Sequence, residues 1–80
     1  MKIAVRYLSI FEDLCGIAGE ELEVPDAIDL SELLRTIATA HGRRLEQQMV
    51  SALIQGRHAS LRTVLADGDE VALMPRLSGG

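Results

Sequence analysis

One helical segment stands between two pairs of strand-like segments, and this order restricts the folds that the chain can adopt. Apolar side chains recur at helical spacing over residues 30–38, after the candidate N-cap Asp29 and before the candidate stop Gly42. The residues of this stripe are Leu30, Leu33, Leu34, Ile37 and Ala38. We therefore expect a single amphipathic helix that buries one face against the rest of the chain.

The remaining apolar residues follow the alternating pattern of half-buried strands. The expected strands are residues 2–8, 20–24, 52–54 and 70–74, with turns at Gln55-Gly56 and Asp67-Gly68. In the first strand Ile3 and Tyr7 share one face. In the second strand Glu20, Glu21 and Glu23 predict a solvated acidic edge.

This order of elements predicts an α+β fold in which a mixed sheet packs on one main helix. If the first and last strands lie side by side and parallel in the centre, their connection crosses over by way of the helix. That arrangement is the β-grasp fold known from ubiquitin. We expect one domain over residues 1–75, followed by a flexible C-terminal tail over residues 76–80.

Composition limits both how the fold is held together and what it binds. The 80-residue chain has 48% apolar residues, one cysteine and no Cys or His pair at a metal-ligand spacing, so packing has to stabilise it. Its net charge of -4 and 2% aromatic content argue against nucleic acid as a partner. Because no signal sequence or membrane-spanning run is visible, we expect a cytoplasmic protein that binds neither metal nor membrane.

The printed sequence ends on Gly79-Gly80, shortly after the closing strand and Pro75. Two glycines lose much conformational entropy on ordering, so they are a poor ending for a domain that needs only stability. They suit a tail that enters a narrow site on another protein, because they carry no Cβ atom. The residues after Pro75 reach roughly 17 Å when extended, which is enough to enter a deep pocket.

Two parts of the sequence resemble the small sulfur-carrying subunits of molybdopterin synthases, the MoaD type. They are the run Leu65-Ala66-Asp67-Gly68-Asp69-Glu70-Val71-Ala72-Leu73-Met74-Pro75 and the ending Leu77-Ser78-Gly79-Gly80. The stretch from Val5 to Gly16 is similar as well, so the likeness spans the whole chain. The resemblance implies membership of the MoaD/ThiS group of ubiquitin-like sulfur carriers.

The resemblance implies a carrier cycle on the terminal carboxylate of Gly80. An E1-like adenylating enzyme would use ATP to form a Gly80 acyl-adenylate, and a donor such as a cysteine desulfurase would supply sulfur for a Gly80 thiocarboxylate. Leu77, Ser78 and Gly79 would thread into the large subunit of the synthase, where the thiocarboxylate gives its sulfur to the pyranopterin precursor of the dithiolene. The implied complex is a heterotetramer of two small and two large subunits.

The resemblance also implies that the chain has no catalytic residues of its own and holds no cofactor stably. Leu8 and Met74 fall outside the alternation that buries their neighbours, so we expect an apolar partner-binding patch there, with Pro75 and Arg76 beside it. Arg76 replaces the second proline of a common family tail, and Glu12-Asp13 replaces a frequent Arg-Glu pair. Both departures leave the choice of partner open.

The remaining reactive side chains are expected to have structural roles. Cys15 lies in an apolar stretch, which favours a small packed side chain over a persulfide relay. His41 at the helix end and His58 beside a turn are expected at the surface or as a cap. Two other functions stay open: a sulfur carrier for thiamin, cysteine or tRNA thiolation or a ubiquitin-like protein modifier, and a binding module whose diglycine is incidental.

Overall fold

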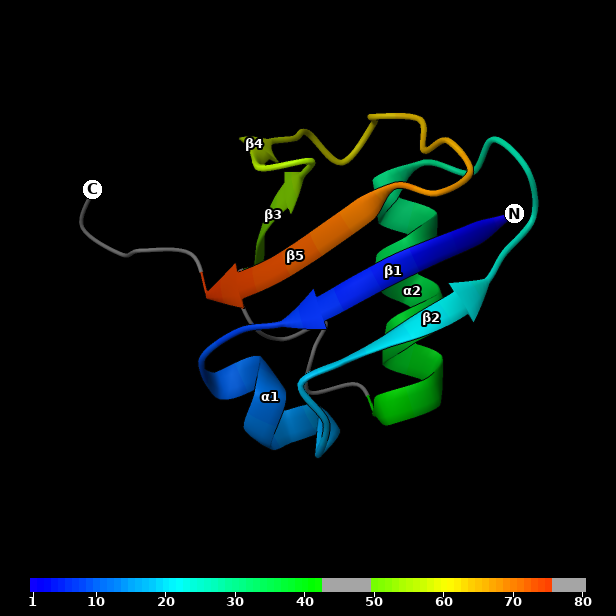
Figure 1. Cartoon of the computed structure of the whole chain (residues 1–80). Coiled ribbons are helices and arrows are strands. Elements are labelled where there is room, and N and C mark those ends of the chain that lie inside the picture. The colour runs from blue at the N-terminus through cyan, green and yellow to red at the C-terminus, as the bar shows by residue number, and fades with distance from the viewer. Residues whose placement is uncertain (43–49, 76–80) are drawn as a thin grey trace.

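The structure is a computed structural model that describes residues 1–42 and 50–75 (Figure 1). Along the chain its elements are β1 (Lys2–Tyr7), α1 (Ile10–Cys15), β2 (Gly19–Glu23), α2 (Leu30–His41), β3 (Val50–Ile54), β4 (Arg57–His58) and β5 (Glu70–Pro75). Neither helix within these two ranges is long and apolar enough to cross a membrane.

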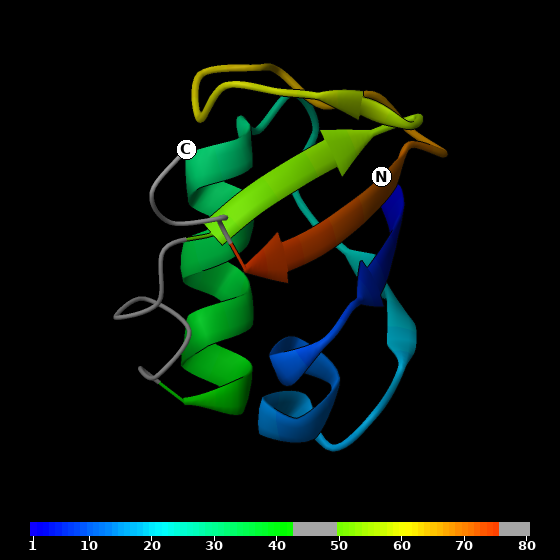
Figure 2. The ribbon, with the colours of Figure 1, turned by 90° about the vertical axis from the view of Figure 1, so that its left-hand side faces the viewer.

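The strands form one mixed sheet in the order β2-β1-β5-β3-β4. β1 and β5 run parallel in the centre, with Val5 opposite Val71, and the other neighbouring strands are antiparallel. α2 lies across one face of the sheet and forms the second layer (Figure 1 and Figure 2). The predicted α+β class and β-grasp arrangement are confirmed.

The core fills the space between the sheet and α2. Alternate residues of β1 and β5 point into it, because successive side chains of a strand face opposite sides of the sheet. The buried apolar residues are Ile3, Val5, Tyr7, Phe11, Val24, Ile28, Leu30, Leu33, Ile37, Ala38, Ala52, Leu65, Val71 and Leu73. Burial of one large apolar side chain stabilises a fold by roughly 1.5–3 kcal/mol, so packing is the main source of stability here.

α2 begins and ends where the sequence predicts. The Asp29 carboxylate accepts hydrogen bonds from the Glu32 N–H (2.9 Å) and the Ser31 hydroxyl (2.7 Å), which satisfies a free donor of the first turn. Hydrogen bonds from Ser31 and from the Glu32 backbone hold the pKa of Asp29 below its usual range. Gly42 follows the last turn with a positive φ of 107°.

A turn at residues 66–69 ties the start of β5 to the start of β1. The Ala66 N–H donates to the Asp69 carboxylate (2.8 Å), and Gly68 has a positive φ of 85°. The Lys2 N–H donates to the Asp67 carboxylate (2.7 Å), and the Gly68 N–H donates to the Lys2 carbonyl (2.8 Å). The turn predicted at Asp67-Gly68 is present, and it fixes the parallel register of the two central strands.

Two short elements are missing from the sequence-based prediction. α1 has six residues, too few for a helical repeat to be recognised, and the buried Phe11 anchors it. It begins after Ser9, whose φ is 57°, and ends at Gly16 in the left-handed region. β4 has two exposed residues that pair with Leu53 and Ile54 of β3, so it carries no apolar alternation.

The other strands differ from prediction by one or two residues at their ends. β2 begins and ends one residue earlier than predicted, and Val24 continues into the core beyond its end. β1 ends at Tyr7 rather than Leu8, and β3 begins at Val50. β5 extends to Pro75, which lies opposite Val50.

Candidate functional site

The candidate site lies where β5 ends and the chain continues toward the diglycine. β5 is held between β1 and β3 along its length, with Pro75 opposite Val50. On the other side, the Leu8 N–H donates to the Leu73 carbonyl (2.9 Å), which continues the pairing beyond the end of β1. The point from which residues 76–80 leave the domain is therefore fixed on both sides.

The open face of the sheet, opposite α2, meets this point. We use the name open face for the outward residues Ala4, Arg6, Ser51, Leu53, Ala72 and Met74. Val71 and Leu73 are buried against the helix layer, so Ala72 and Met74 point the other way. In Figure 1 the sheet is seen from this side, with α2 behind it.

The two apolar residues singled out in the sequence come together at one end of this face. Tyr7 lies opposite Leu73 in the parallel register, so Leu8 and Met74 are the next positions along the two strands. Both side chains are half-buried, as is Pro75. An apolar patch that is only half covered is typical of a docking surface.

One ion pair lies on the open face. The Arg6 guanidinium is 3.6 Å from the Glu70 carboxylate, and both side chains are more than half exposed. An exposed pair of this kind contributes at most about 1 kcal/mol, so a partner could replace it at little cost. Arg62 follows β4 and lies outside the strands of the sheet.

α1 lies beside the end of β5 (Figure 1) and carries exposed apolar residues. Ile10 in its first turn is 42% exposed, and Ile17 just beyond it is 39% exposed. Glu12 and Asp13 are exposed on the same short helix. The sequence pattern misses Ile10 as a site residue, because its direction is known only once α1 is recognised as a helix.

A polar cluster lies at the same end of the sheet, on the side that faces α2, and it corrects the prediction for Glu20. Glu20 is not part of a solvated edge: its carboxylate accepts hydrogen bonds from the Tyr7 hydroxyl (2.6 Å) and from His41 Nε2 (2.5 Å). His41 lies in the last turn of α2, as predicted for a capping residue, but its side chain is only 19% exposed and is not a free surface group. It also meets the Tyr7 ring edge-on, with 5.7 Å between ring centroids.

Burial and the two hydrogen bonds shift the pKa values in this cluster in opposite directions. Burial, followed by the hydrogen bond to Glu20, raises the pKa of Tyr7 far above its usual range. Burial alone would raise the pKa of Glu20, but the hydrogen bonds from Tyr7 and His41 outweigh it and lower that pKa. The cluster thus ties β1, β2 and the end of α2 together around one carboxylate.

We expect Glu20→Gln to lower the free energy of unfolding by about 1.5–3 kcal/mol at pH 7, the usual contribution of a hydrogen-bonded charge. The pKa of Glu20 is lowered on folding, so its stabilisation is present above the unfolded pKa of about 4.3 and is lost as the pH falls through the folded value. Urea denaturation at pH 7 and at pH 3 measures this. Glu21→Gln, on an exposed neighbour, should change stability by less than about 0.5 kcal/mol; equal effects at both positions would contradict the assignment.

The other reactive side chains do not form a catalytic group in the described ranges. Cys15 is half-buried, and burial together with the nearby Glu20 charge raises the pKa of its thiol, which disfavours the reactive thiolate. His58 Nδ1 lies 3.3 Å from the Ser51 hydroxyl on the exposed strand pair β3 and β4. Within residues 1–42 and 50–75, no three His, Cys, Asp or Glu side chains gather as a metal site.

The tail residues Arg76, Leu77, Ser78, Gly79 and Gly80 lie outside the described residues. Their predicted roles in partner binding, threading and covalent modification stay predictions. The same holds for the division into a domain over residues 1–75 and a tail over residues 76–80. Leu8, Met74 and Pro75 are brought together at the start of that tail, whereas their contact with a partner remains to be tested.

Comparison with known proteins places the chain among sulfur carriers. Residues 5–80 match the ThiS family. The molybdopterin synthase sulfur carrier subunit of Mycobacterium tuberculosis is 33% identical over 82 residues, which cover 100% of this chain and 99% of that protein. The protein of the same name from Chlamydomonas reinhardtii is 32% identical over 84 residues, with 100% of both chains covered.

A solved structure agrees with the sequence relatives. The protein described as molybdopterin converting factor, subunit 1, from Pyrococcus furiosus is 26% identical and superposes with a TM-score of 0.88. The superposition covers 96% of this chain and 99% of that one. The chain therefore belongs to the ThiS family, and its resemblance to the sulfur carrier subunits of molybdopterin synthases is confirmed.

Proposed function

We propose that this chain is the sulfur carrier subunit of a molybdopterin synthase and that Gly80 carries the sulfur. The main support is 33% identity over the whole chain to a protein of that name. The Gly79-Gly80 pair of this sequence is the second support. The fold is compatible with this role, because the central strand β5 leads directly into residues 76–80. A carrier needs a rigid domain that presents a reactive end, and it needs no active site of its own.

The chemistry proceeds on the terminal carboxylate of Gly80, which is ionised at neutral pH and resists nucleophiles. One carboxylate oxygen attacks the α-phosphorus of ATP, pyrophosphate leaves, and an acyl-adenylate forms. Hydrosulfide attacks the acyl carbon and AMP leaves, which gives the thiocarboxylate. In the transfer step the sulfur attacks a carbon of the pyranopterin precursor and displaces an oxygen substituent, which leaves as water or phosphate; water then cleaves the acyl–sulfur bond and restores the carboxylate.

This cycle assigns the catalytic steps to partners. An E1-like adenylating enzyme binds the ATP, a donor such as a cysteine desulfurase supplies the sulfur, and the large subunit binds the pterin. Two small and two large subunits form the proposed synthase, in the cytoplasm. The word subunit in the names of the relatives supports a large-subunit partner. The small chain is a sulfur donor in this complex and binds no cofactor stably.

The open face supplies the proposed docking surface for these partners. Leu8 and Met74 form its apolar end, and Pro75 and Arg76 lead from it into the tail. Leu77, Ser78 and Gly79 then thread into the partner, because small side chains fit a narrow channel. A partner seated on this end of the sheet is positioned next to the tail that it has to receive.

A second candidate follows from the family match, which names no sulfur acceptor. The same thiocarboxylate would serve another pathway, such as thiamin, cysteine or tRNA thiolation, or Gly80 would be joined to other proteins. Sulfur transfer to the pyranopterin precursor in the presence of the cognate large subunit separates the candidates. Only the first candidate predicts that the dithiolene product forms.

We expect the purified chain to gain about 16 Da, the difference between sulfur and oxygen, when it is incubated with the E1-like enzyme, ATP and sulfide. The terminal carboxylate is the group that the proposal activates, so intact-mass spectrometry should show this change. Deletion of Gly79 and Gly80 should abolish it. A chain that forms neither adenylate nor thiocarboxylate with its cognate partner would contradict both candidates.

A further inference from the structure

The sequence contains a single lysine, Lys2, against seven arginines. An arginine guanidinium stays protonated in proteins and does not attack an acyl group, whereas a neutral amine does. The proposed function places an activated carbonyl on Gly80, so any amine of the carrier competes with sulfide for it. In the printed sequence the amines are the Lys2 side chain and the N-terminal amine of Met1.

The N-terminal amine is already engaged in the sheet. It donates to the Val24 carbonyl (2.7 Å) and lies 3.3 Å from the Asp26 carboxylate. The Val24 N–H donates in return to the Met1 carbonyl (2.9 Å), and the Met1 side chain is only 4% exposed. Attack by this amine would require the first residue of the chain to leave its pairing with β2.

The Lys2 side chain, in contrast, is presented from a rigid base. The Lys2 N–H donates to the Asp67 carboxylate (2.7 Å), and its carbonyl accepts from the Gly68 N–H (2.8 Å). The residue is exposed, and its ammonium forms no salt bridge with another residue of the described ranges. Glu23 lies opposite it on β2. Lys2 is therefore an accessible amine in an acidic setting.

Lys2 lies at the end of the sheet opposite to the end from which the tail leaves (Figure 1). It comes five positions before Tyr7, which pairs with Leu73, and Pro75 comes two positions after Leu73. Seven positions at about 3.3 Å each separate Lys2 from Pro75 by roughly 23 Å. Because the tail reaches roughly 17 Å, Gly80 meets its own Lys2 only when tail and lysine are both fully extended along the sheet. The Lys2 of a second copy requires no such extension.

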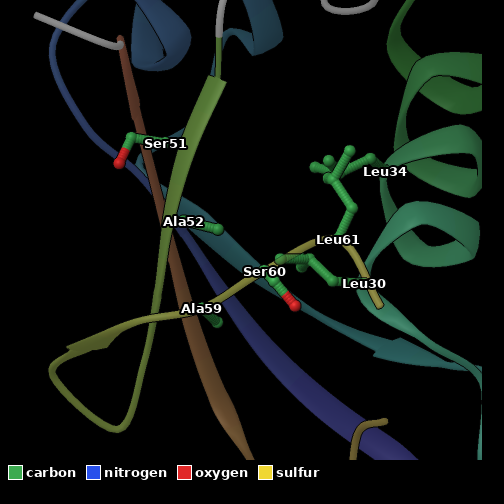
Figure 3. Close-up of a pocket in the computed structure, with 7 residues that line it drawn as sticks. All are labelled: Leu30, Leu34, Ser51, Ala52, Ala59, Ser60 and Leu61. Carbon is green, nitrogen blue, oxygen red and sulfur yellow. The ribbon is translucent and has the colours of Figure 1, made fainter. Parts of the chain in front are cut away.

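Two other places in the described ranges are unsuitable as acceptors. The groove between α2 and β3 is one of them, and Figure 3 shows Leu34 and Ala52 pointing toward each other across it. Its seven lining residues carry neither an amine nor a charge. The other is Cys15, whose thiol is half-buried. Burial and the nearby Glu20 charge raise the pKa of this thiol, which disfavours a thioester.

We propose that Lys2 is a modification site to which a second copy of this chain is joined through its activated Gly80. The inference rests on the proposed activation of Gly80. The neutral Lys2 amine attacks the acyl carbon of the adenylate and forms a C–N bond, while the bond from that carbon to the phosphate oxygen breaks. AMP leaves with the electron pair, and the amine proton passes to water. The product is an isopeptide-linked pair of chains.

The incoming tail and its acceptor are complementary in charge. Arg76 is the only charged side chain of residues 76–80, and Glu23 and Asp67 flank Lys2. Opposite charges of this kind guide a partner to one position among several. Sulfide and Lys2 compete for the same adenylate, so the linked pair should form when sulfide is scarce.

The test incubates the purified full chain with the E1-like enzyme and ATP, without sulfide, at about pH 8.5, because a lysine amine attacks only in its neutral form. Intact-mass spectrometry should show a species of twice the chain mass minus one water, and peptide mapping should place the linkage on Lys2. Added sulfide should lower the amount of this species about tenfold or more, because it consumes the adenylate. Pyrophosphate release in the same reaction reports the activation of Gly80 separately.

Two variants separate the amine from its charge and its position. Lys2→Arg keeps the charge and should lower the linked species about 20-fold or more, with pyrophosphate release unchanged. Arg57→Lys, added to the Lys2→Arg chain, restores an exposed amine at the other edge of the sheet, within residues 50–65, which contain no Asp or Glu. It should recover less than about a fifth of the product, because the flanking carboxylates are missing there. Unchanged melting temperatures establish that both variants are folded.

Three outcomes would overturn the proposal. One is pyrophosphate release without a linked species. Another is a linkage on Met1, or a species of one chain mass minus one water, in which the tail has closed on its own domain. The third is full recovery of the product by Arg57→Lys.

A reaction without pyrophosphate release would contradict the proposed function instead. The full chain prepared with a thioester at Gly80 needs no enzyme for acyl transfer, and it then tests Lys2 by the same mapping. A linked pair on Lys2 from this chain would support the modification site, and a linkage elsewhere or none would overturn it.

Discussion

One alanine appended after Gly80 should abolish sulfur transfer and leave the melting temperature unchanged. The extension moves the reacting carbon by about 3.5 Å from the site that is built to act on it. Loss of alignment by as little as about 1 Å can lower a rate about 100-fold, so this displacement is too large to tolerate. Single-turnover transfer with the cognate large subunit measures the effect, and thermal unfolding is the control.

Two substitutions within the tail test whether the small size of Gly79 matters for transfer when the length of the chain is unchanged. Gly79→Ala adds a methyl group where a narrow channel leaves no space, and we expect transfer to fall tenfold or more, on the order of 1.4 kcal/mol in the transition state. Ser78→Ala is the matched control and should lose much less. Full activity of the extended chain would show that Gly80 is not the reactive end.

Met74→Arg should weaken binding to both the large subunit and the E1-like enzyme about 100-fold or more. Its side chain lies on the open face, opposite Ser51, and an unpaired charge buried in an apolar interface costs about 3–5 kcal/mol. The fold should remain, because Met74 is half-buried and points away from the core that Leu73 enters. Titration calorimetry with each partner measures the loss.

Two further variants serve as controls for the Met74→Arg prediction: one tests the effect of added charge alone, and the other tests the open face at a second position. Ala40→Arg adds the same charge at an exposed position of α2 and should leave both affinities unchanged. Leu53→Arg places a charge on the same open face from β3 and should weaken binding as well. If Met74→Arg binds normally while folded, the open face is not the docking surface.

The fold could be predicted because its long elements carry clear local signals. Asp29 and the apolar stripe of the helix specify where α2 begins and which face it buries, and the alternation in the first and last strands specifies their inward residues. The turn at Asp67-Gly68 then fixes how those strands meet. α1 and β4 escaped prediction because six and two residues are too few to show a period.

The candidate site could be predicted only in part. Leu8 and Met74 break the strand alternation visibly, so their shared position at the end of the open face follows from the sequence once the parallel pairing is assumed. The partners of Glu20 could not be predicted from the sequence. His41 lies 21 positions away from Glu20 and reaches it only because α2 crosses the sheet.

The central place of β5 has a consequence for how the protein is made. The first strand of the sheet can complete its pairing only with the last one, so nearly the whole chain has to be synthesised before the sheet can close. Such distant pairing makes folding slow, because loop closure precedes the contacts that compensate for it. Under the proposed function this order would also act as quality control: a truncated or unfolded chain has no completed sheet from which to offer its C-terminus, so its partners would charge only a finished domain.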